Sequence, residues 1–160
     1  MSTGDKGAIE CVKPALYLTD ELHRLYIQVA QTEHQVYKGF RKKKKAQKAI
    51  DAFDKVLSRT LDPYCQIIQS VACTKAQGKV FAESVVRLYE LFVSLNESRI
   101  DVLREFKQNG MSPKVYALNE KSLAICGDYD KLFPVVKQQA ENLHDIFSAM
   151  GLFEILDIDT

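Results

Sequence analysis

The chain has 160 residues, of which 46% are hydrophobic and 27% are charged, and its formal net charge at pH 7 is +1. This length fits one domain, and the composition is that of an ordinary globular protein that buries roughly 70% of its unfolded surface. The near-neutral charge gives no overall reason to expect a nucleic-acid partner, so an electrostatic contact has to come from a local cluster.

The start of the chain and its cysteines bear on the compartment. The first residues lack the apolar segment of a secretory signal, and no run of about eighteen apolar residues occurs after them. We therefore expect an intracellular protein, cytoplasmic by default, without a membrane-spanning helix. We also expect the cysteines to be reduced and buried, because they form no C-x-x-C pair. They are Cys11, Cys65, Cys73 and Cys126.

The first helix is predicted over residues 14–38. Residues 1–12 are small and polar, and we expect them to be disordered or loosely attached. Pro14 suits the first turn of a helix, where its missing N–H costs nothing. Apolar residues then recur at steps of three and four as far as Val36, which is the spacing of one helical face.

Gly39 leaves two alternatives for the end of this first helix. A glycine can end a helix in the left-handed conformation, which favours a break here, although no Ser, Thr, Asp or Asn comes next to cap a new helix. The alternative is one continuous helix from residue 14 to about residue 60. Such a helix would be about 70 Å long and would require an elongated, dimeric coiled-coil body.

The second and third helical regions are predicted at 40–75 and 79–109. In the second region, Asp62 and Pro63 interrupt the pattern, because proline removes a helical hydrogen bond while the aspartate can cap a restarted helix. The third region contains no Gly or Pro. Its apolar stripe, centred on Phe92, is too wide for a two-stranded seam, so two or more helices have to cover it.

A turn separates the third region from the fourth. Gly110 can end one helix, and Ser112 with Pro113 can cap and begin the next. The fourth region, 113–150, shows a predicted break at Gly127 and Asp128, and Pro134 would begin its second half.

Four helical regions joined by short connections predict an all-α fold. Short connections favour antiparallel neighbours, so we expect an up-down-up-down four-helix bundle with kinked or broken second and fourth helices. The bundle domain spans residues 13–151. It lies between the N-terminal segment and an acidic, apolar tail at 152–160, which could fold back over the bundle or dock on a partner.

The most distinctive local feature is a run of basic residues with no acid between Glu33 and Asp51. Seven of the 22 basic residues fall here, which leaves 15 in the rest of the chain against 21 acids. Such a run could bind anionic lipid head groups, an acidic protein or a polyanion, and it fits the loose pattern of a nuclear-import signal. The members of this basic cluster are Lys38, Arg41, Lys42, Lys43, Lys44, Lys45 and Lys48.

The residues beside the basic cluster help to choose among these partners. Tyr37 and Phe40 favour a membrane surface, because aromatic rings can enter the interface while lysines meet phosphates. Nucleic acid is disfavoured, since the run has no interleaved aromatic residues for base stacking and no nucleic-acid-reading module surrounds it. The remaining interpretation is a solvated helix end that only keeps the protein soluble.

The sequence contains no convincing metal or catalytic pattern. Glu141 and His144, and more loosely Asp20 and His23, have the Glu-x-x-His spacing of di-iron bundles. The acids that would complete such a site are predicted to face solvent. These acids are Glu83, Glu90 and Glu97. Because no nucleophile elbow or Gly-rich phosphate loop occurs either, we expect no metal, no cofactor and no enzymatic activity.

These features predict a non-enzymatic interaction or adaptor module that presents helix faces to another protein. The alternative is a peripheral membrane protein that binds anionic lipid through the basic cluster. Both hypotheses leave room for a homodimer, and the basic cluster leaves room for a nuclear location.

Overall fold

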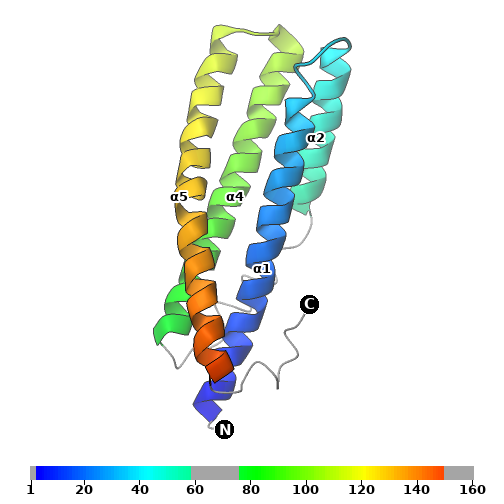
Figure 1. Cartoon of the computed structure of the whole chain (residues 1–160). Helices are drawn as coiled ribbons and strands as arrows, with labels where there is room; N and C mark the ends of the chain where they lie inside the picture. The colour runs from blue at the N-terminus through cyan, green and yellow to red at the C-terminus, as the bar shows by residue number, and fades with distance from the viewer. Residues whose placement is uncertain (1–2, 59–75, 150–160) are drawn as a thin grey trace. The chain divides into compact units, whose positions relative to one another are not determined.

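The computed structural model describes residues 3–58 and 76–149, and these residues form helices and turns without a strand (Figure 1). Side chains are described from Leu16 to Ser58 and, with few exceptions, from Lys79 to Asp145. The helices of this part of the chain are α1 (Thr3–His34), α2 (Lys42–Ser58), α4 (Ala76–Asn109) and α5 (Pro113–Ala149). The predicted all-α class is confirmed, and the packing of the helices is that of a bundle.

The chain divides into two compact units, each built from segments that are distant in the sequence. The first unit comprises Met1–Glu21, Leu61–Leu88 and Lys131–Thr160, and the second comprises Leu22–Thr60 and Tyr89–Asp130. The predicted division into an N-terminal segment, a bundle at 13–151 and a tail at 152–160 stays a prediction, because the tail lies outside the described residues.

The described core of the first unit is built mainly from apolar side chains. Its residues from α4 form the first part of the apolar stripe predicted for the third helical region. Phe81, Val85 and Leu88 are spaced by four and three residues, which places them on one helical face. The exposed Val80 does not belong to this core. The buried apolar side chains are Leu18 of α1, Phe81, Ala82, Val85 and Leu88 of α4, and Val136 and Leu143 of α5, and the polar Thr19 of α1 is buried too.

The core of the second unit draws buried apolar side chains from all four described helices. Phe53 of α2 and Phe92 of α4 are among the largest side chains that are fully buried here. The expected burial of Phe92 is thereby confirmed. Because Leu91, Leu95 and Ile100 are buried as well, the buried surface of α4 is too wide for one partner helix, as the sequence predicted.

The connection between α1 and α2 contains the predicted break at Gly39. Gly39 has a φ of 69°, in the left-handed region that glycine adopts without strain. Arg41 comes two residues later with a φ of 60° and accepts the first backbone hydrogen bond of α2, from the amide of Lys45 at 3.0 Å. The alternative of one continuous helix from residue 14 to about residue 60 is wrong, because the chain turns between these two helices.

The connection between α4 and α5 also has the predicted pattern. Gly110 has a φ of 66°, and its amide donates to the Phe106 carbonyl at 2.8 Å, which closes the end of α4. The hydroxyl of Ser112 accepts a hydrogen bond from the Val115 amide at 3.3 Å and so caps α5 ahead of Pro113.

Two predicted boundaries are wrong. α1 begins at Thr3, so Pro14 stands inside the helix and not in its first turn. A proline there removes one backbone hydrogen bond, but in this helix it does not end the helical run. α5 runs without a break through Gly127 and past Pro134. A single helical glycine costs only about 1 kcal/mol relative to alanine and a proline about 3 kcal/mol, and the buried contacts of Val115, Tyr129, Val136 and Leu143 along α5 offset these costs. The interruption predicted at Asp62 and Pro63 lies outside the described residues.

None of the described helices is both long enough and apolar enough to cross a bilayer.

Candidate functional site

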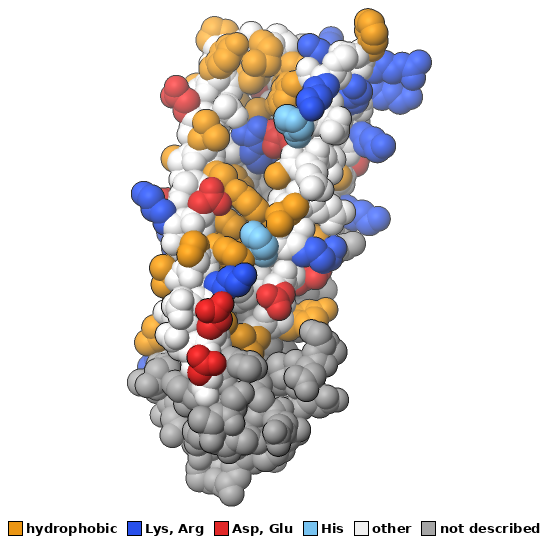
Figure 2. All heavy atoms as spheres, viewed as in Figure 1, with side chains coloured by type: hydrophobic (Ala, Val, Ile, Leu, Met, Phe, Trp, Pro, Cys, Tyr) orange, Lys and Arg blue, Asp and Glu red, His pale blue; other side chains and the backbone are white. Residues whose placement is uncertain are grey.

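The structure gathers the basic cluster at the connection between α1 and α2 and along the first turns of α2. Six of its seven members are exposed, and Lys45 is partly covered. The ammonium of Lys45 donates to the backbone carbonyl of Lys38, just beyond the end of α1, and so helps to hold the connection. Figure 2 shows Lys and Arg side chains concentrated at this end, beside a protruding hydrophobic side chain.

The two aromatic residues beside the cluster differ in their surroundings, because one is exposed and the other is packed against α4. Phe40 is 91% exposed. Tyr37 instead packs edge-on against Phe106 of α4, with ring centroids 5.0 Å apart, and burial raises the pKa of its phenol. The expectation that both rings could enter a membrane interface is therefore corrected, because Tyr37 is already engaged and Phe40 alone projects.

The cluster surrounds a surface hollow of about 450 Å³. Arg41, Lys44, Lys45 and Lys48 line it, together with Gln47 and Asp51. The Gln47 amide donates to the Asp51 carboxylate at 2.8 Å and accepts from the Lys107 ammonium at 2.5 Å. Asp51 is the acid among these described lining residues, so positive charge predominates in the hollow.

The basic cluster is unfavourable for the stability of α2 itself. The first turn of α2 consists of the lysines 42–45 and contains no acid. The N-terminus of a helix carries a partial positive charge, and a cation placed there costs roughly 0.3–1 kcal/mol where an acid would contribute that much. Arg41 adds a left-handed backbone conformation that arginine rarely adopts. Apart from Lys45, which bonds the Lys38 carbonyl, stability of the fold therefore does not explain why these charges stand here.

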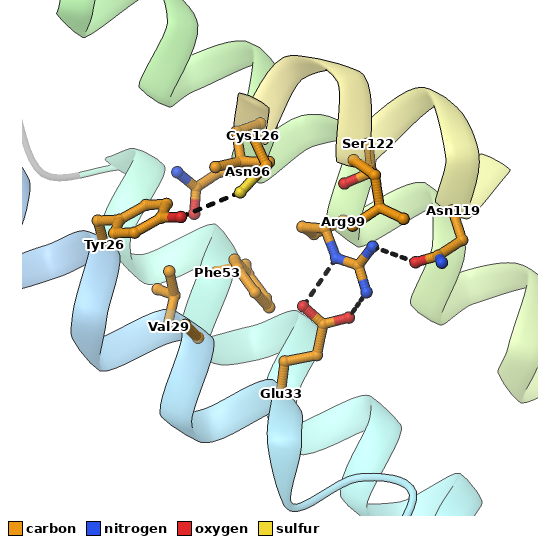
Figure 3. A pocket seen from close by; sticks show the side chains of 12 residues that line it. Tyr26, Val29, Glu33, Phe53, Asn96, Arg99, Asn119, Ser122 and Cys126 are labelled. Atoms are coloured by element: carbon orange, nitrogen blue, oxygen red, sulfur yellow. Dashed lines mark hydrogen bonds and ion pairs between the residues drawn. The ribbon is translucent and has the colours of Figure 1, made fainter. Parts of the chain in front are cut away.

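A second feature of the second unit is a cavity of about 190 Å³ that all four helices line. Exposed residues such as Ala30 and Leu123 contribute to the lining, so the cavity reaches the surface. Figure 3 shows the side chains around this space. The lining residues are Tyr26, Val29, Ala30 and Glu33 of α1, Phe53 of α2, Leu95, Asn96 and Arg99 of α4, and Asn119, Ser122, Leu123 and Cys126 of α5.

An ion pair forms one side of this cavity. The Arg99 guanidinium donates from Nε to Glu33 Oε2 at 2.7 Å and from Nη2 to Glu33 Oε1, and it donates from Nη1 to Asn119 Oδ1 at 2.6 Å. The Arg99 and Glu33 side chains are only 15% and 12% exposed. Burial lowers the pKa of Arg99, but an arginine keeps its charge at neutral pH. The two opposite charges are thus matched inside the second unit.

Another group of polar side chains lies near Tyr26. Its hydroxyl lies 3.0 Å from Cys126 Sγ and donates to Asp130 Oδ1 at 3.1 Å, while its ring stacks on Tyr129 with centroids 4.5 Å apart. Burial, followed by the neighbouring thiol and carboxylate, raises the pKa of Tyr26, and burial likewise raises that of Tyr129. Both phenols therefore stay protonated at neutral pH, and the Tyr26 hydroxyl is committed to protein partners.

Asn96 and Ser122 contribute the buried oxygens of the lining. Each residue is 1% exposed. Asn96 Nδ2 donates to the Phe92 carbonyl at 2.7 Å, whereas Asn96 Oδ1 and Ser122 Oγ have no hydrogen-bond partner among the described residues. Buried polar atoms are nearly always paired, so these two oxygens call for an explanation.

No protein-family model, curated protein or solved structure matches this chain. Its function has to be argued from its own residues.

The Glu-x-x-His spacings noted in the sequence raise the question of a metal site among the described side chains. No group of three or more His, Cys, Asp or Glu residues suited to a metal ion occurs among them. The acids Glu83, Glu90 and Glu97 are exposed, as predicted. The His144 side chain lies outside the described part, as do those of Cys11, Cys65 and Cys73. Cys126 is a free thiol but is only partly buried, so the expected burial is not met at this cysteine.

The sequence predicts the basic cluster but not the cavity. Arg99 was visible as a charge that interrupts the apolar stripe of the third helical region, and this interruption was the one local signal. Its partner Glu33 is 66 residues away and stood out only as the last acid before the basic run. Nothing in the local pattern linked the two.

Proposed function

We propose that the protein is a non-enzymatic helical interaction module whose α1–α2 connection binds an anionic membrane surface. The observation that carries this proposal is Phe40, which is 91% exposed and lies between the basic residues Lys38 and Arg41. A projecting ring can enter the interfacial region of a bilayer while the surrounding cations meet lipid phosphates.

The charge arrangement supports the same proposal. Juxtamembrane lysine and arginine residues gain about 1 kcal/mol each near an anionic leaflet. The lysines in the first turn of α2 oppose the dipole of their own helix, and an anionic surface would relieve that repulsion. Because a charged surface acts over about 8 Å at physiological salt, only the cluster and its immediate neighbours contribute.

The bundle that presents this surface is proposed to be up-down-up-down. In the second unit, Arg99 contacts Asn119 and Glu105 contacts Ser112, so residue numbers rise on α4 as they fall on α5. Glu33 contacts Arg99, and Tyr37, just after α1, contacts Phe106. Residue numbers therefore rise in the same direction on both sides of this contact, which supports parallel α1 and α4. This topology puts the α1–α2 and α4–α5 connections at one end of the second unit.

Vesicle sedimentation tests the proposal. We expect the protein to pellet with phosphatidylcholine vesicles that contain phosphatidylserine, to remain in solution with phosphatidylcholine alone, and to dissociate as salt is raised. A cluster variant with glutamine at four exposed positions is expected to lose binding while keeping its helicity. These positions are Lys42, Lys43, Lys44 and Lys48. Lys45 is left intact because it holds the connection.

The matched control removes the same charge elsewhere, at four exposed lysines of α4 and α5. These are Lys79 of α4 and Lys121, Lys131 and Lys137 of α5, each changed to glutamine. We expect this control to bind like the wild type. Equal binding by both quadruple variants, or no wild-type binding at low salt, would rule out the membrane proposal. Phe40→Ser is expected to weaken binding by about tenfold at constant charge, as loss of one buried aromatic ring at an interface implies.

A second candidate function is an adaptor that binds another protein or a second copy of itself through α5. Tyr116 and Leu123 support it, because both are exposed apolar residues and their seven-residue spacing places them on one helical face. Sedimentation velocity over a range of protein concentrations tests self-association. We expect Tyr116→Ser with Leu123→Ser to abolish a concentration-dependent dimer, whereas the lysine variants of the cluster leave it intact.

A further inference from the structure

The cavity between the helices of the second unit has the size of a small-molecule site. Its volume is about 190 Å³. A closed apolar cavity of about 150 Å³ is known to admit a benzene molecule, so this one has room for a single ring with a small substituent. Val29, Phe53 and Leu95 supply apolar and aromatic surface on three different helices.

Two buried oxygens in the lining require a hydrogen-bond donor or a hydroxyl partner. The Phe92 carbonyl accepts from Asn96 Nδ2, and this fixes the orientation of the amide, because its oxygen would repel the carbonyl oxygen. Asn96 Oδ1 is therefore an acceptor without a partner among the described residues. The same holds for Ser122 Oγ, which can either accept or donate. Figure 3 shows both side chains at the same pocket, one from α4 and one from α5.

The charges in the lining are already matched, and this limits the kind of ligand. The Glu33 carboxylate accepts hydrogen bonds from Nε and Nη2 of Arg99, and Nη1 of the same guanidinium donates to Asn119. A charged ligand would enter without a free counter-charge, and burying an unpaired charge is costly. The cavity therefore favours a neutral molecule with an apolar body.

We propose that this cavity binds a neutral, ring-sized aromatic molecule that carries one hydroxyl or N–H donor, as in phenols and small indoles. The ring packs against Phe53, Val29 and Leu95. Its donor reaches Asn96 Oδ1, and the Ser122 hydroxyl completes the polar end of the site. The site discriminates by its donor requirement, because an analogue without the donor leaves the buried oxygens unpaired.

Phenol and toluene are the probes, since they have nearly the same size and differ in the hydroxyl. The full chain is titrated with each, and amide chemical shifts are followed by NMR. We expect phenol to bind at least tenfold more tightly than toluene, with the largest shifts at the cavity residues of α4 and α5. The proposal would be overturned by equal affinity for the two probes or by chemical-shift changes centred elsewhere. It would also be overturned if phenol did not bind up to its solubility, because water alone would then occupy the site.

Two variants locate the binding. Asn96→Leu keeps the volume but removes the acceptor, and we expect it to reverse the preference so that toluene binds more tightly than phenol. Ser122→Leu fills the cavity, and we expect it to abolish binding of both probes. Ser98→Ala is the control, because Ser98 is also buried on α4 but its hydroxyl donates to the Leu95 carbonyl and it does not line the cavity.

Circular dichroism of each variant establishes that it folds. Should Asn96→Leu fail to fold, Ser122→Leu decides alone, and unchanged phenol binding in that variant would place the ligand outside the cavity and overturn the proposal.

Discussion

The guanidinium of Arg99 on α4 donates two hydrogen bonds to the carboxylate of Glu33 on α1, in a pair of which each side chain is less than one-sixth exposed. The two residues come from segments that are 66 positions apart, so the pair fixes the register of α1 against α4 in the second unit. A further hydrogen bond, from Nη1 of Arg99, extends this arrangement to Asn119 on α5. Three helices are thus connected by one side chain.

Removal of one partner of this pair is expected to destabilise the protein strongly. Arg99→Met leaves the Glu33 carboxylate buried without a partner, and the expected loss is about 3 kcal/mol in the free energy of unfolding. The double variant Arg99→Met with Glu33→Leu removes both charges and is expected to regain most of this loss. Urea denaturation at neutral pH measures both. A single variant as stable as the wild type would mean that solvent screens the pair.

Phe92→Ala is expected to destabilise the protein by about 3–5 kcal/mol, because the substitution removes a fully buried ring and leaves a cavity in the second unit. Val80→Ala is the control on the same helix, since Val80 is half exposed and its truncation is expected to cost less than about 0.5 kcal/mol. Chemical denaturation of both variants checks the expectation. A loss below about 1 kcal/mol for Phe92→Ala would contradict the register of α4.

The sequence predicted those features that local chemistry decides. Gly39 and Gly110 marked real turns, because the chain needs a left-handed residue at each of them. The burial of Phe92 was predictable from its place in a helical period. The break at Gly127 was wrong for the opposite reason: a glycine permits a turn without requiring one, and the neighbouring residues continue the helix.

The candidate sites were predicted unequally, and the range of the interactions explains the difference. The basic cluster is contiguous in sequence, so its position and exposure could be anticipated. The orientation of Tyr37 could not, because its packing against Phe106 depends on how the chain leaves α1. The cavity joins four helices, and its unpaired oxygens at Asn96 and Ser122 are ordinary polar residues until tertiary packing buries them.

The raised pKa values of three tyrosines lead us to expect a loss of stability at alkaline pH. Burial raises the pKa of Tyr26, Tyr37 and Tyr129 above the value of about 10 expected in the unfolded chain. The folded protein then holds these protons more tightly than the unfolded chain, so the contribution is complete below about pH 10 and is lost as pH rises beyond it. We expect the free energy of unfolding to fall progressively as pH rises above about 10.

Tyr37→Phe measures the contribution of Tyr37 to this loss of stability at alkaline pH. No hydrogen bond of the Tyr37 hydroxyl occurs among the described contacts, so the variant keeps the ring contact with Phe106 and removes one ionisable group. Urea denaturation across the same pH range is expected to show a shallower decline for Tyr37→Phe than for the wild type. Identical slopes would mean that Tyr37 ionises freely in the folded state.

Arg41 allows stability and membrane binding to be separated at one position. It has a φ of 60°, a conformation that costs most L-residues about 1–2 kcal/mol and that asparagine tolerates better. Its positive charge also stands at the N-terminus of α2, where a cation is unfavourable. Arg41→Asn is therefore expected to raise the free energy of unfolding by about 1 kcal/mol.

The same Arg41→Asn variant is expected to bind anionic vesicles several-fold more weakly, since it removes a cation from the exposed cluster, worth about 1 kcal/mol near such a surface. The control Arg41→Lys keeps the charge and the strained backbone, so we expect wild-type stability and nearly wild-type binding. Thermal denaturation and vesicle sedimentation measure the two effects in parallel. If Arg41→Asn gained stability without losing binding, the residue would lie outside the membrane contact, and the strain at this position would have no part in the proposed function.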